Sequence, residues 1–383
     1  MFTLSRRGFL ATAAVLPFAP TIQAADAAKY WVYIGTGGGG KPPSKGIYRC
    51  EFDPITGKLG EPELAAEVSN PGFLAIHPTK KFLYSLGKVD KADGVVAYSL
   101  DAKTGAITKL NEFKLGGVGP CHLNVDKTGR CLVVANYGGG SCTALKVDKD
   151  GKLGTDQDFH QHKGSSVNPA RQKEPHTHSA NFTPDGQYVI LADLGLDKLI
   201  VYKVDAAAGT LTEHGQYKMN LGSGPRHFAW HPNGKWAYSN GELDASVTAL
   251  SYDAEKGTFA TINANSTLPA DTAESVRKGN STAETVVHPS GKWVFVSNRG
   301  HNSLAVFKVG AEGGLTPAGH VTGDIKVPRN FNIDPSGKWI LVANQDGDSV
   351  TVFEWDNDKG TAKANGGKIA VPRPICLKFV AKE

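Results

Sequence analysis

The chain is poor in cysteine and methionine, and beyond its first residues it has no long hydrophobic segment. Five cysteines and two methionines occur among its 383 residues. The cysteine count is odd and no Cys-x-x-Cys pair is present, a pattern that disfavours a cysteine-based metal cluster. No segment after the N-terminus is apolar over the roughly 20 residues that a membrane-spanning helix needs. We therefore expect neither a membrane span nor a bound metal.

Motifs that carry several common kinds of enzyme chemistry are also missing. No Gly-x-Ser-x-Gly is present, which argues against a serine hydrolase with a nucleophile elbow. The glycine run at 37–40 does not lead into the Gly-Lys-Ser/Thr of a phosphate-cradling loop. Helical periodicity is scarce, and no Gly-x-Gly-x-x-Gly opens a helix. We therefore expect no nucleotide or other cofactor.

Charge and composition set further limits. The formal net charge is +5, and no basic stripe is visible, so nucleic acid is not an expected partner. Forty-five glycines and 21 prolines are spread evenly, as in a protein with many tight turns. A hydrophobic content of 40% is enough for a packed core.

The N-terminus resembles an export signal. It reads SRRGFL at 5–10, continues with an apolar run over 9–18, and reaches a small-residue cleavage pattern, IQA, at 22–24. We predict a twin-arginine signal peptide over 1–24, export to the periplasm by the twin-arginine machinery, and a folded domain over 25–383. The alternative interpretation is a basic, unstructured tip.

The rest of the chain repeats one phrase: a short apolar strand, Pro-x-Gly-Lys or a variant, and a second aromatic and β-branched strand. Examples are TVVHPSGKWVFVSN at 285–298 and FNIDPSGKWILVAN at 331–344. The six copies have their turn proline, or its equivalent, at Pro78, Lys127, Pro184, Pro232, Pro289 and Pro335. A four-stranded unit that recurs every 46 to 57 residues is typical of a β-propeller.

A seventh copy is split between the two ends of the chain. YWVYIGT at 30–36 and GIYRCEFDPITGKLG at 46–60 resemble the second and third strands of a unit that lacks its first strand. VPRPICLKF at 371–379 repeats the opening of VPRNFNID at 327–334 and supplies the missing strand. We predict an all-β, seven-bladed β-propeller in which the C-terminal strand closes the ring by pairing with the N-terminal blade.

Two alignment columns converge on one face of this ring, where the first strand of each blade begins and the second ends. The first column, six residues before the turn proline, reads Gly72, Cys121, His178, Arg226, Ala283, Arg329 and, in the split blade, Arg373. The second column reads Lys88, Tyr137, Leu194, Glu242, Arg299 and Gln345. The columns gather arginines, a histidine and a carboxylate, and they predict an anion-binding pocket with a candidate base.

Each of these residues also has a structural interpretation. Arg226 and Glu242 can simply pair across their own blade. His176 and His178, on alternate positions of a strand, are compatible with a metal, although no third ligand is evident. The residues just before the second column, Asn136, Asp193, Asn298 and Asn344, suit either a calcium ion or hydrogen bonds that cap strand ends.

Several phrases, in order over most of residues 30–380, resemble the lactonase-type seven-bladed propeller family. They include ANYGGGS at 135–141, RQKEPHTHSANFTPDG at 171–186 and GPRHFAWHPNGKWAYSNGELDAS at 224–246. The family includes one class of 6-phosphogluconolactonase and the fungal carboxymuconate cyclase. The resemblance implies that the active residues are His178, Arg226, Glu242 and Arg299. It departs from the family pattern at Cys121 and Gly241.

We therefore expect hydrolysis of a small anionic or sugar-acid lactone, as in 6-phosphogluconolactonases. Glu242 is expected to act as general base and His178 as second base or leaving-group acid, while Arg226 and Arg299 stabilise the oxyanion. His227, Arg329 and His176 are expected to bind substrate. The alternatives are a lactonising, carboxymuconate-type cyclase, a metal-dependent lactonase and a non-enzymatic periplasmic binding propeller.

Overall fold

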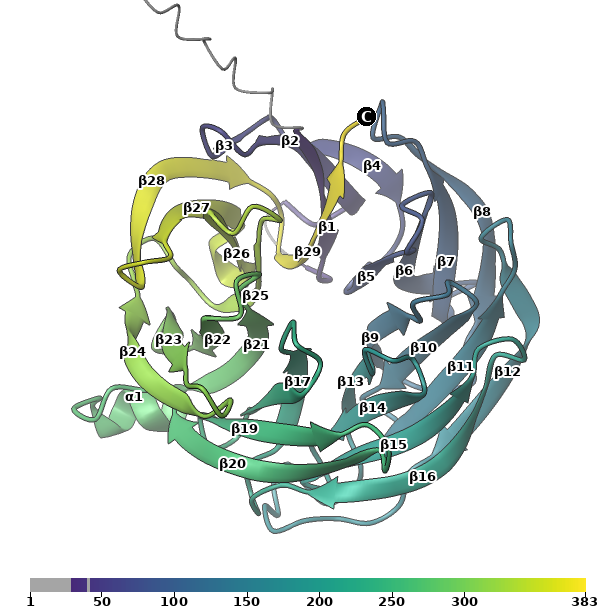
Figure 1. The fold of residues 1–383 in the computed structure, drawn as a ribbon. Helices are drawn as coiled ribbons and strands as arrows, with labels where there is room; N and C mark the ends of the chain where they lie inside the picture. Colours follow the sequence, from purple (N-terminus) through teal and green to yellow (C-terminus); the bar gives the residue numbers. More distant parts are fainter. Residues whose placement is uncertain (1–28, 40–41) are drawn as a thin grey trace, which may run out of the picture.

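Seven antiparallel sheets form a ring in the computed structural model, which describes residues 29–39 and 42–383 (Figure 1). This arrangement confirms the predicted seven-bladed, all-β propeller. The predicted signal peptide, residues 1–24, lies outside the described residues. None of the helices in the described part of the chain has the length and hydropathy to cross a membrane.

The strands follow the chain in blade order. The first blade contains β1 (Tyr30–Thr36), β2 (Gly46–Asp53), β3 (Lys58–Leu59), β4 (Glu63–Glu67) and β29 (Pro374–Ala381). The second contains β5 (Leu74–Ile76), β6 (Phe82–Val89), β7 (Ala92–Leu100) and β8 (Ile107–Lys114), and the third contains β9 (Pro120–Val125), β10 (Cys131–Asn136), β11 (Ser141–Val147) and β12 (Leu153–Gln161). The fourth contains β13 (Thr177–Phe182), β14 (Tyr188–Asp193), β15 (Lys198–Asp205) and β16 (Thr210–Lys218).

The remaining blades have the same four-stranded order. The fifth contains β17 (Pro225–Trp230), β18 (Trp236–Gly241), β19 (Ser246–Asp253) and β20 (Thr258–Ser266). A short helix, α1 (Glu274–Gly279), precedes the sixth, which contains β21 (Ser281–Val287), β22 (Trp293–Arg299), β23 (Ser303–Val309) and β24 (Leu315–Val321). The seventh contains β25 (Pro328–Ile333), β26 (Trp339–Asn344), β27 (Ser349–Asp356) and β28 (Thr361–Ala370), with a 3-10 turn, η1 (Gln345–Gly347), after β26.

The two ends of the chain close the ring as predicted. β29 pairs antiparallel with β1, with Trp31 opposite Val380 and Ile34 opposite Leu377. Side chains of this blade pack against β26 and β27 of the last blade in one buried apolar cluster. Each fully buried leucine or valine there contributes about 1.5–3 kcal/mol. Closure therefore buries the inner strands of the first and last blades.

The repeated hairpin explains both the glycine and the histidine of the sequence repeat. The turn glycines 129, 186, 234, 291 and 337 have φ between 70° and 78°, a region that favours glycine. In three repeats the histidine before the turn proline reaches the next blade: His77, His231 and His288 lie 3.1, 3.0 and 2.7 Å from the carbonyl oxygens of Gly129, Gly291 and Gly337. These histidines join neighbouring blades and are not part of the predicted pocket.

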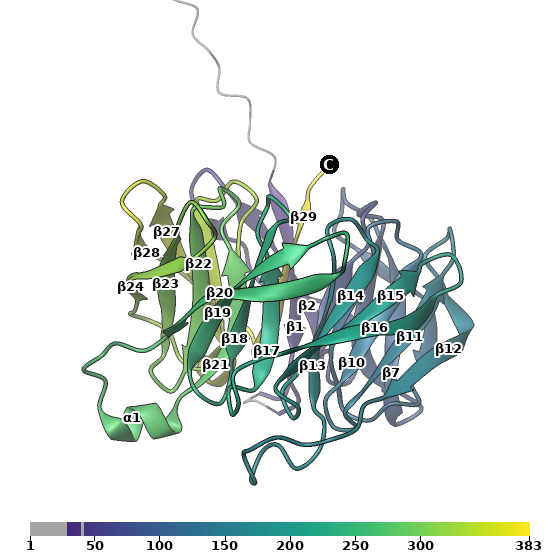
Figure 2. The same cartoon turned by 60° about the horizontal axis from the view of Figure 1, so that its bottom comes forward.

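The two faces of the ring differ. The repeated hairpins between the first and second strands of the blades lie on one face, and the connections between blades lie on the other, which we call the mouth face. Its longest connections, residues 162–176 and 267–280, lead into β13 and β21. Figure 2 shows α1, which belongs to the second of these connections, on the opposite side of the ring from the C-terminus. Both alignment columns lie on the mouth face.

Candidate active site

A two-lobed cavity opens at the mouth face of the ring. One lobe, of about 320 Å³, is lined by Gly119, Cys121, Tyr137, Arg171, His178, Glu242, Arg299 and Arg329, and we call it the carboxylate lobe. The other, of about 250 Å³, includes Gly37, Gly38, Gly72, Arg226, His227, Gln345 and Arg373, and we call it the glycine lobe. Cys121, His178 and Arg329 line both lobes, so the lobes adjoin each other.

The alignment columns account for most of this lining. From the first column, every member except Ala283 lines the cavity, and from the second, Tyr137, Glu242, Arg299 and Gln345 do. Lys88 instead pairs with Asp93 at 2.6 Å, and Leu194 is fully buried in the core. The predicted His178, Arg226, Glu242, Arg299, His227 and Arg329 are thus brought together.

Glu242 is the electrostatic centre of the carboxylate lobe. Its Oε2 lies 2.8 Å from Arg226 Nε and 3.2 Å from Arg299 Nη2, and its Oε1 accepts a hydrogen bond of 2.9 Å from Arg171 Nη2. Burial by itself raises the pKa of Glu242, but the three arginines outweigh it and lower the pKa to about 2. The side chain is therefore an ionised carboxylate whose two oxygens are both occupied.

The local fold places Arg226 and Glu242 side by side. Arg226 is the second residue of β17 and Glu242 directly follows β18, and these strands are antiparallel neighbours, with Pro225 opposite Gly241. The Glu242 N–H donates to the Gly224 carbonyl at 2.8 Å. Arg226 is almost fully buried and also donates to the Ala283 carbonyl of the next blade. The predicted pairing across one blade is therefore present, as part of a larger cluster.

The other two arginines of the carboxylate lobe are crowded by like charge. Burial, followed by the charge of Arg226, lowers the pKa of Arg299 to about 9 and that of Arg329 to about 10. Arg299 Nη2 donates to the Thr282 carbonyl at 2.7 Å. Among the described residues, the Arg329 side chain has no ion pair or hydrogen bond. Arg329 is therefore available to an anion entering either lobe.

His178 is a neutral imidazole at the junction of the lobes. Burial and the positive charge of Arg226 lower its pKa well below the ordinary value of 6.5. Its Nδ1 lies 3.6 Å from Cys121 Sγ, and its Nε2 has no hydrogen-bond partner among the described residues. Burial raises the pKa of the Cys121 thiol to about 12, so this thiol stays protonated at neutral pH.

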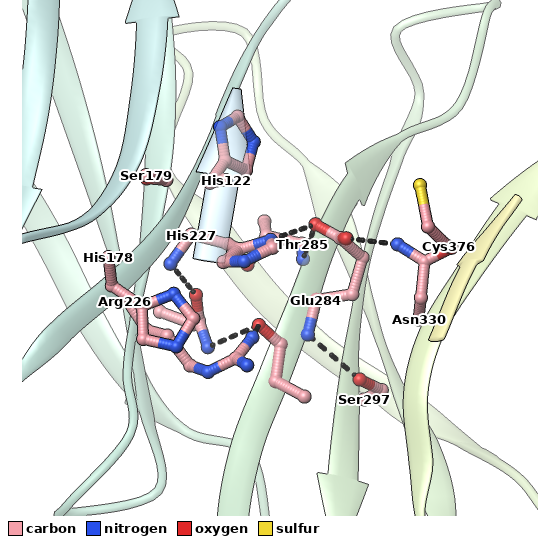
Figure 3. A network of polar contacts seen from close by, with 12 residues as sticks. His122, His178, Ser179, Arg226, His227, Glu284, Thr285, Ser297, Asn330 and Cys376 are labelled. Atoms are coloured by element: carbon pink, nitrogen blue, oxygen red, sulfur yellow. Dashed lines mark hydrogen bonds and ion pairs between the residues drawn. The ribbon is translucent and has the colours of Figure 1, made fainter. Parts of the chain in front are cut away.

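A second polar network lies deeper in the ring (Figure 3). His227 Nδ1 lies 2.7 Å from Glu284 Oε1, and Asn330 donates to Glu284 Oε2. The ring of His227 lies between those of His178 and His122, with centroids 5.3 Å from each. Burial lowers the pKa of His227, and the Glu284 carboxylate accepts a hydrogen bond from its Nδ1–H. Glu284 therefore orients a histidine that faces the cavity.

This network separates the mouth cavity from a cavity at the opposite face. The second cavity, of about 440 Å³, is lined by Lys80, Asn124, Asn181, Glu284, Asn332 and Lys378, among others. Phe73 and His227 line both cavities, and the Phe73 ring packs on His122 with centroids 4.1 Å apart. The candidate site therefore has a floor of aromatic rings.

The remaining predictions concern His176, the strand-end asparagines and a bound metal. His176 lines neither lobe: it stacks on Tyr137, with ring centroids 4.6 Å apart, and its Nδ1 lies 3.0 Å from the Tyr137 carbonyl. Asn136 donates to Ser141 and Thr143, a contact within the hairpin of the kind expected for a strand cap. In the described part of the chain, no group of three or more His, Cys, Asp or Glu side chains has a metal-binding arrangement.

Sequence reasoning missed Arg171 and Glu284. Arg171 lies in the 162–176 connection, outside the repeat, so no alignment column contains it. Its Nη2 donates one hydrogen bond to Tyr137 Oη at 3.1 Å and another to Glu242 Oε1 at 2.9 Å. Glu284 directly follows the column position Ala283 and is equivalent to His227 in the repeat, and its charge within the inner strand STAETVV is the signal that could have identified it.

Comparisons with known proteins agree with the seven-bladed fold. Residues 32–379 match the family described as "Lactonase, 7-bladed beta-propeller". A 6-phosphogluconolactonase of Bacillus subtilis is 38% identical over 92% of this chain and 99% of its own length. The structure of a periplasmic gluconolactonase from Pseudomonas aeruginosa superposes with a TM-score of 0.86 at 29% identity, covering 93% of this chain and all of that one. A putative 6-phosphogluconolactonase from Bacteroides fragilis superposes at 0.84 with 34% identity, covering 94% and 100%.

Proposed function

Because this chain belongs to the lactonase seven-bladed β-propeller family, we propose that it hydrolyses a sugar-acid lactone in the two-lobed cavity, with water as the nucleophile. One observation carries the proposal: a neutral imidazole with a free nitrogen, His178, faces the same cavity as a cluster of arginines held by one carboxylate, Glu242. Such a site combines a proton acceptor with donors for an oxyanion.

The reaction follows from these groups. Water attacks the lactone carbonyl carbon and gives up a proton to His178 as the new carbon–oxygen bond forms. The carbonyl oxygen becomes an oxyanion that accepts hydrogen bonds from Arg329 and Arg299. The bond from the carbonyl carbon to the ring oxygen then breaks, and the proton on His178 passes to that ring oxygen. The product is the open-chain sugar acid.

This proposal moves the general-base role, which the sequence analysis assigned to Glu242, to His178. Both oxygens of Glu242 already form ion pairs with arginines, and its pKa of about 2 makes it a weak base. His178 Nε2 has no such partner in the described structure. An anionic substrate neutralises the nearby arginines and so raises the pKa of His178 toward the working pH. Glu242 holds the guanidinium groups in place.

The test is a lactone panel with purified protein. We expect wild-type protein to hydrolyse a gluconolactone and His178→Asn to lower kcat by about 100- to 10,000-fold, the usual contribution of a positioned base. His160→Asn, on the outer strand β12, is the matched control and keeps wild-type kcat. If His178→Asn keeps wild-type kcat and a folded Glu242→Gln loses it, the base is Glu242.

The same panel separates the other functions. Carboxymuconate is included as a substrate for the lactonising reaction, and its conversion without lactone hydrolysis would replace this proposal. Loss of lactonase activity with a chelator, restored by a divalent metal, would indicate a metal-dependent enzyme. Absence of turnover on every lactone would favour a binding propeller.

We also propose that residues 1–24 export the chain to the periplasm by the twin-arginine route. The support is the SRRGFL segment with its apolar run and cleavage pattern, and the similar gluconolactonase of Pseudomonas aeruginosa is described as periplasmic. In cell fractions, the wild type is expected in the periplasm and an Arg6→Lys/Arg7→Lys double variant in the cytoplasm. Equal distribution of the two would contradict the proposal.

A further inference from the structure

The hairpin between β5 and β6 departs from the repeat at its turn. In the other five complete copies the turn residue is a glycine with φ between 70° and 78°, whereas Lys80 takes this place with a φ of 61°. Residues other than glycine rarely adopt this left-handed region, because their Cβ is crowded there. Such outliers persist only where the surroundings impose them, and they cluster at ligand sites and active sites.

The Lys80 side chain lines the second cavity, of about 440 Å³, on the face opposite the mouth, which we call the hairpin-face cavity. Lys378 of β29 lines it as well. Lys378 pairs with Tyr33 of β1 as Asn332 pairs with Leu341 of β26, and each partner lies three residues before the end of its strand. The same inner-strand position in the other blades holds an uncharged residue: Ala75, Asn124, Asn181, Ala229 and Val286. Lysines thus occupy two positions where the repeat places no charge.

Neither lysine has a counter-ion in the described part of the chain. The Lys378 ammonium lies 4.9 Å from the centre of the Phe73 ring, a cation–π contact that leaves its hydrogen bonds unused. Lys80 has no ion pair and no side-chain hydrogen bond among the described residues. The carboxylate that lines this cavity, Glu284, already accepts hydrogen bonds on both oxygens from the deeper polar network. Two ammonium groups are therefore available to an anion.

A buried N–H donor also lines the hairpin-face cavity. His122 of β9 is 6% exposed, and it lines neither lobe at the mouth. Its Nδ1 accepts a hydrogen bond of 3.3 Å from the Ala180 N–H, and burial lowers its pKa well below 6.5, so the neutral ring carries its proton on Nε2. This N–H has no acceptor in the described structure. The His122 ring packs on Phe73, the ring that the Lys378 ammonium also contacts, so both donors lie beside one side chain.

The remainder of the cavity offers apolar surface. Ile76, Val286 and Phe379 line it, and their side chains are partly exposed. An inorganic ion fills only a small part of about 440 Å³ and leaves this apolar surface in contact with water. The occupant that matches both parts of the cavity carries a negative group and a carbon skeleton.

We propose that the hairpin-face cavity is a second binding site, for a small organic acid whose carboxylate accepts hydrogen bonds from Lys80, Lys378 and His122. The ammonium groups supply charge, and the imidazole N–H supplies a directional donor. The partly exposed apolar side chains pack against the carbon skeleton. This site shares Phe73 and His227 with the mouth cavity, and it is independent of lactone hydrolysis.

The experiment uses benzoate as the probe and measures its binding by isothermal titration calorimetry at physiological ionic strength, which screens charges more than about 8 Å away. Benzyl alcohol has the ring without the charge, and inorganic phosphate has the charge without the ring. We expect benzoate to bind the wild type at least about 10-fold more tightly than either. Failure of benzoate to bind overturns the inference.

Lys378→Met keeps the apolar stem beside Phe73 and removes the ammonium group, so it should raise the Kd of benzoate by about 10-fold or more. The matched control is Lys81→Gln, at the neighbouring lysine of the β5–β6 hairpin, which does not line the cavity and should keep the wild-type Kd. Arg329→Gln, which alters the mouth cavity, should keep it too. If the Kd rises in Arg329→Gln and not in Lys378→Met, benzoate binds at the mouth and the inference is overturned.

Lys80→Gly separates a ligand role from a structural one. Glycine is the residue of the equivalent turns and adopts positive φ without strain, so this variant should unfold at the wild-type temperature or above it. Its Kd for benzoate should nevertheless rise by about 10-fold, because an ammonium group is lost. A lower unfolding temperature, or a wild-type Kd, would show that Lys80 does not serve a ligand and would count against the site.

Discussion

Arg226 and Glu242 form a buried ion pair between neighbouring strands of one blade, with 2.8 Å between Nε and Oε2. The two side chains are 2% and 8% exposed. This pair forms the centre of the charged cluster, because Arg171 and Arg299 contact the same carboxylate from other parts of the chain. One negative charge thus holds three positive ones at the mouth of the ring.

Glu242→Gln should therefore destabilise the fold as well as the site. Removing the charge leaves Arg226 buried without a counter-ion, which typically costs about 3–5 kcal/mol in the free energy of unfolding. Urea denaturation measures this change. The control is Glu63→Gln, which breaks an exposed pair with Arg49 and should cost less than about 1 kcal/mol. Equal losses in the two variants would contradict the central role of Glu242.

Glu284 should act mainly as a hydrogen-bond acceptor in the deeper network. Glu284→Ala leaves the Nδ1 proton of His227 and the amide of Asn330 unpaired, at about 1–3 kcal/mol for each buried group. Glu284→Gln keeps an acceptor oxygen and should lose less stability in the same urea measurement. If the two variants are equally unstable, the charge of Glu284 matters more than its hydrogen bonds.

Cys121 should not serve as a nucleophile, although it lies beside His178. With a pKa raised to about 12 by burial, the thiol is protonated at neutral pH, and the thiolate is the reactive form. Cys121→Ser should keep most of the wild-type kcat in a lactone assay. A loss as large as that expected for His178→Asn would show that a covalent intermediate on Cys121 is needed.

Acidification should destabilise the protein. Burial lowers the pKa of His122, His178 and His227 in the folded state, whereas the unfolded chain binds protons on them near pH 6.5. Below that pH the unfolded state holds more protons, so the free energy of unfolding falls by up to about 1.4 kcal/mol per histidine and pH unit. Because the pKa of Glu242 is also lowered in the folded state, the free energy of unfolding falls further as the pH drops from about 4.5 to 2. Urea denaturation at pH 7, 6 and 5 measures the effect, and equal stability at these values would contradict it.

The sequence alone determined the architecture and the face on which the site lies. A repeated hairpin phrase and a split copy at the two ends were sufficient to predict seven blades and the pairing of β29 with β1, because each blade is a local unit whose pattern is written in consecutive residues. The same internal alignment identified His178, Arg226, Glu242 and Arg299, because strand order brings equivalent positions of every blade to one rim.

The tertiary structure alone decided what those residues touch. Arg171 reaches Glu242 across 71 positions of sequence from a connection outside the repeat, whereas His227 and Glu284 are equivalent positions of successive blades whose contact depends on how the blades pack. The proposed role of Glu242 as an anchor for arginines depends on three guanidinium groups that meet its carboxylate only in the folded ring. The protonation states and ion pairs of these side chains depend on which groups lie close together in space. Closure of the ring fixes those distances.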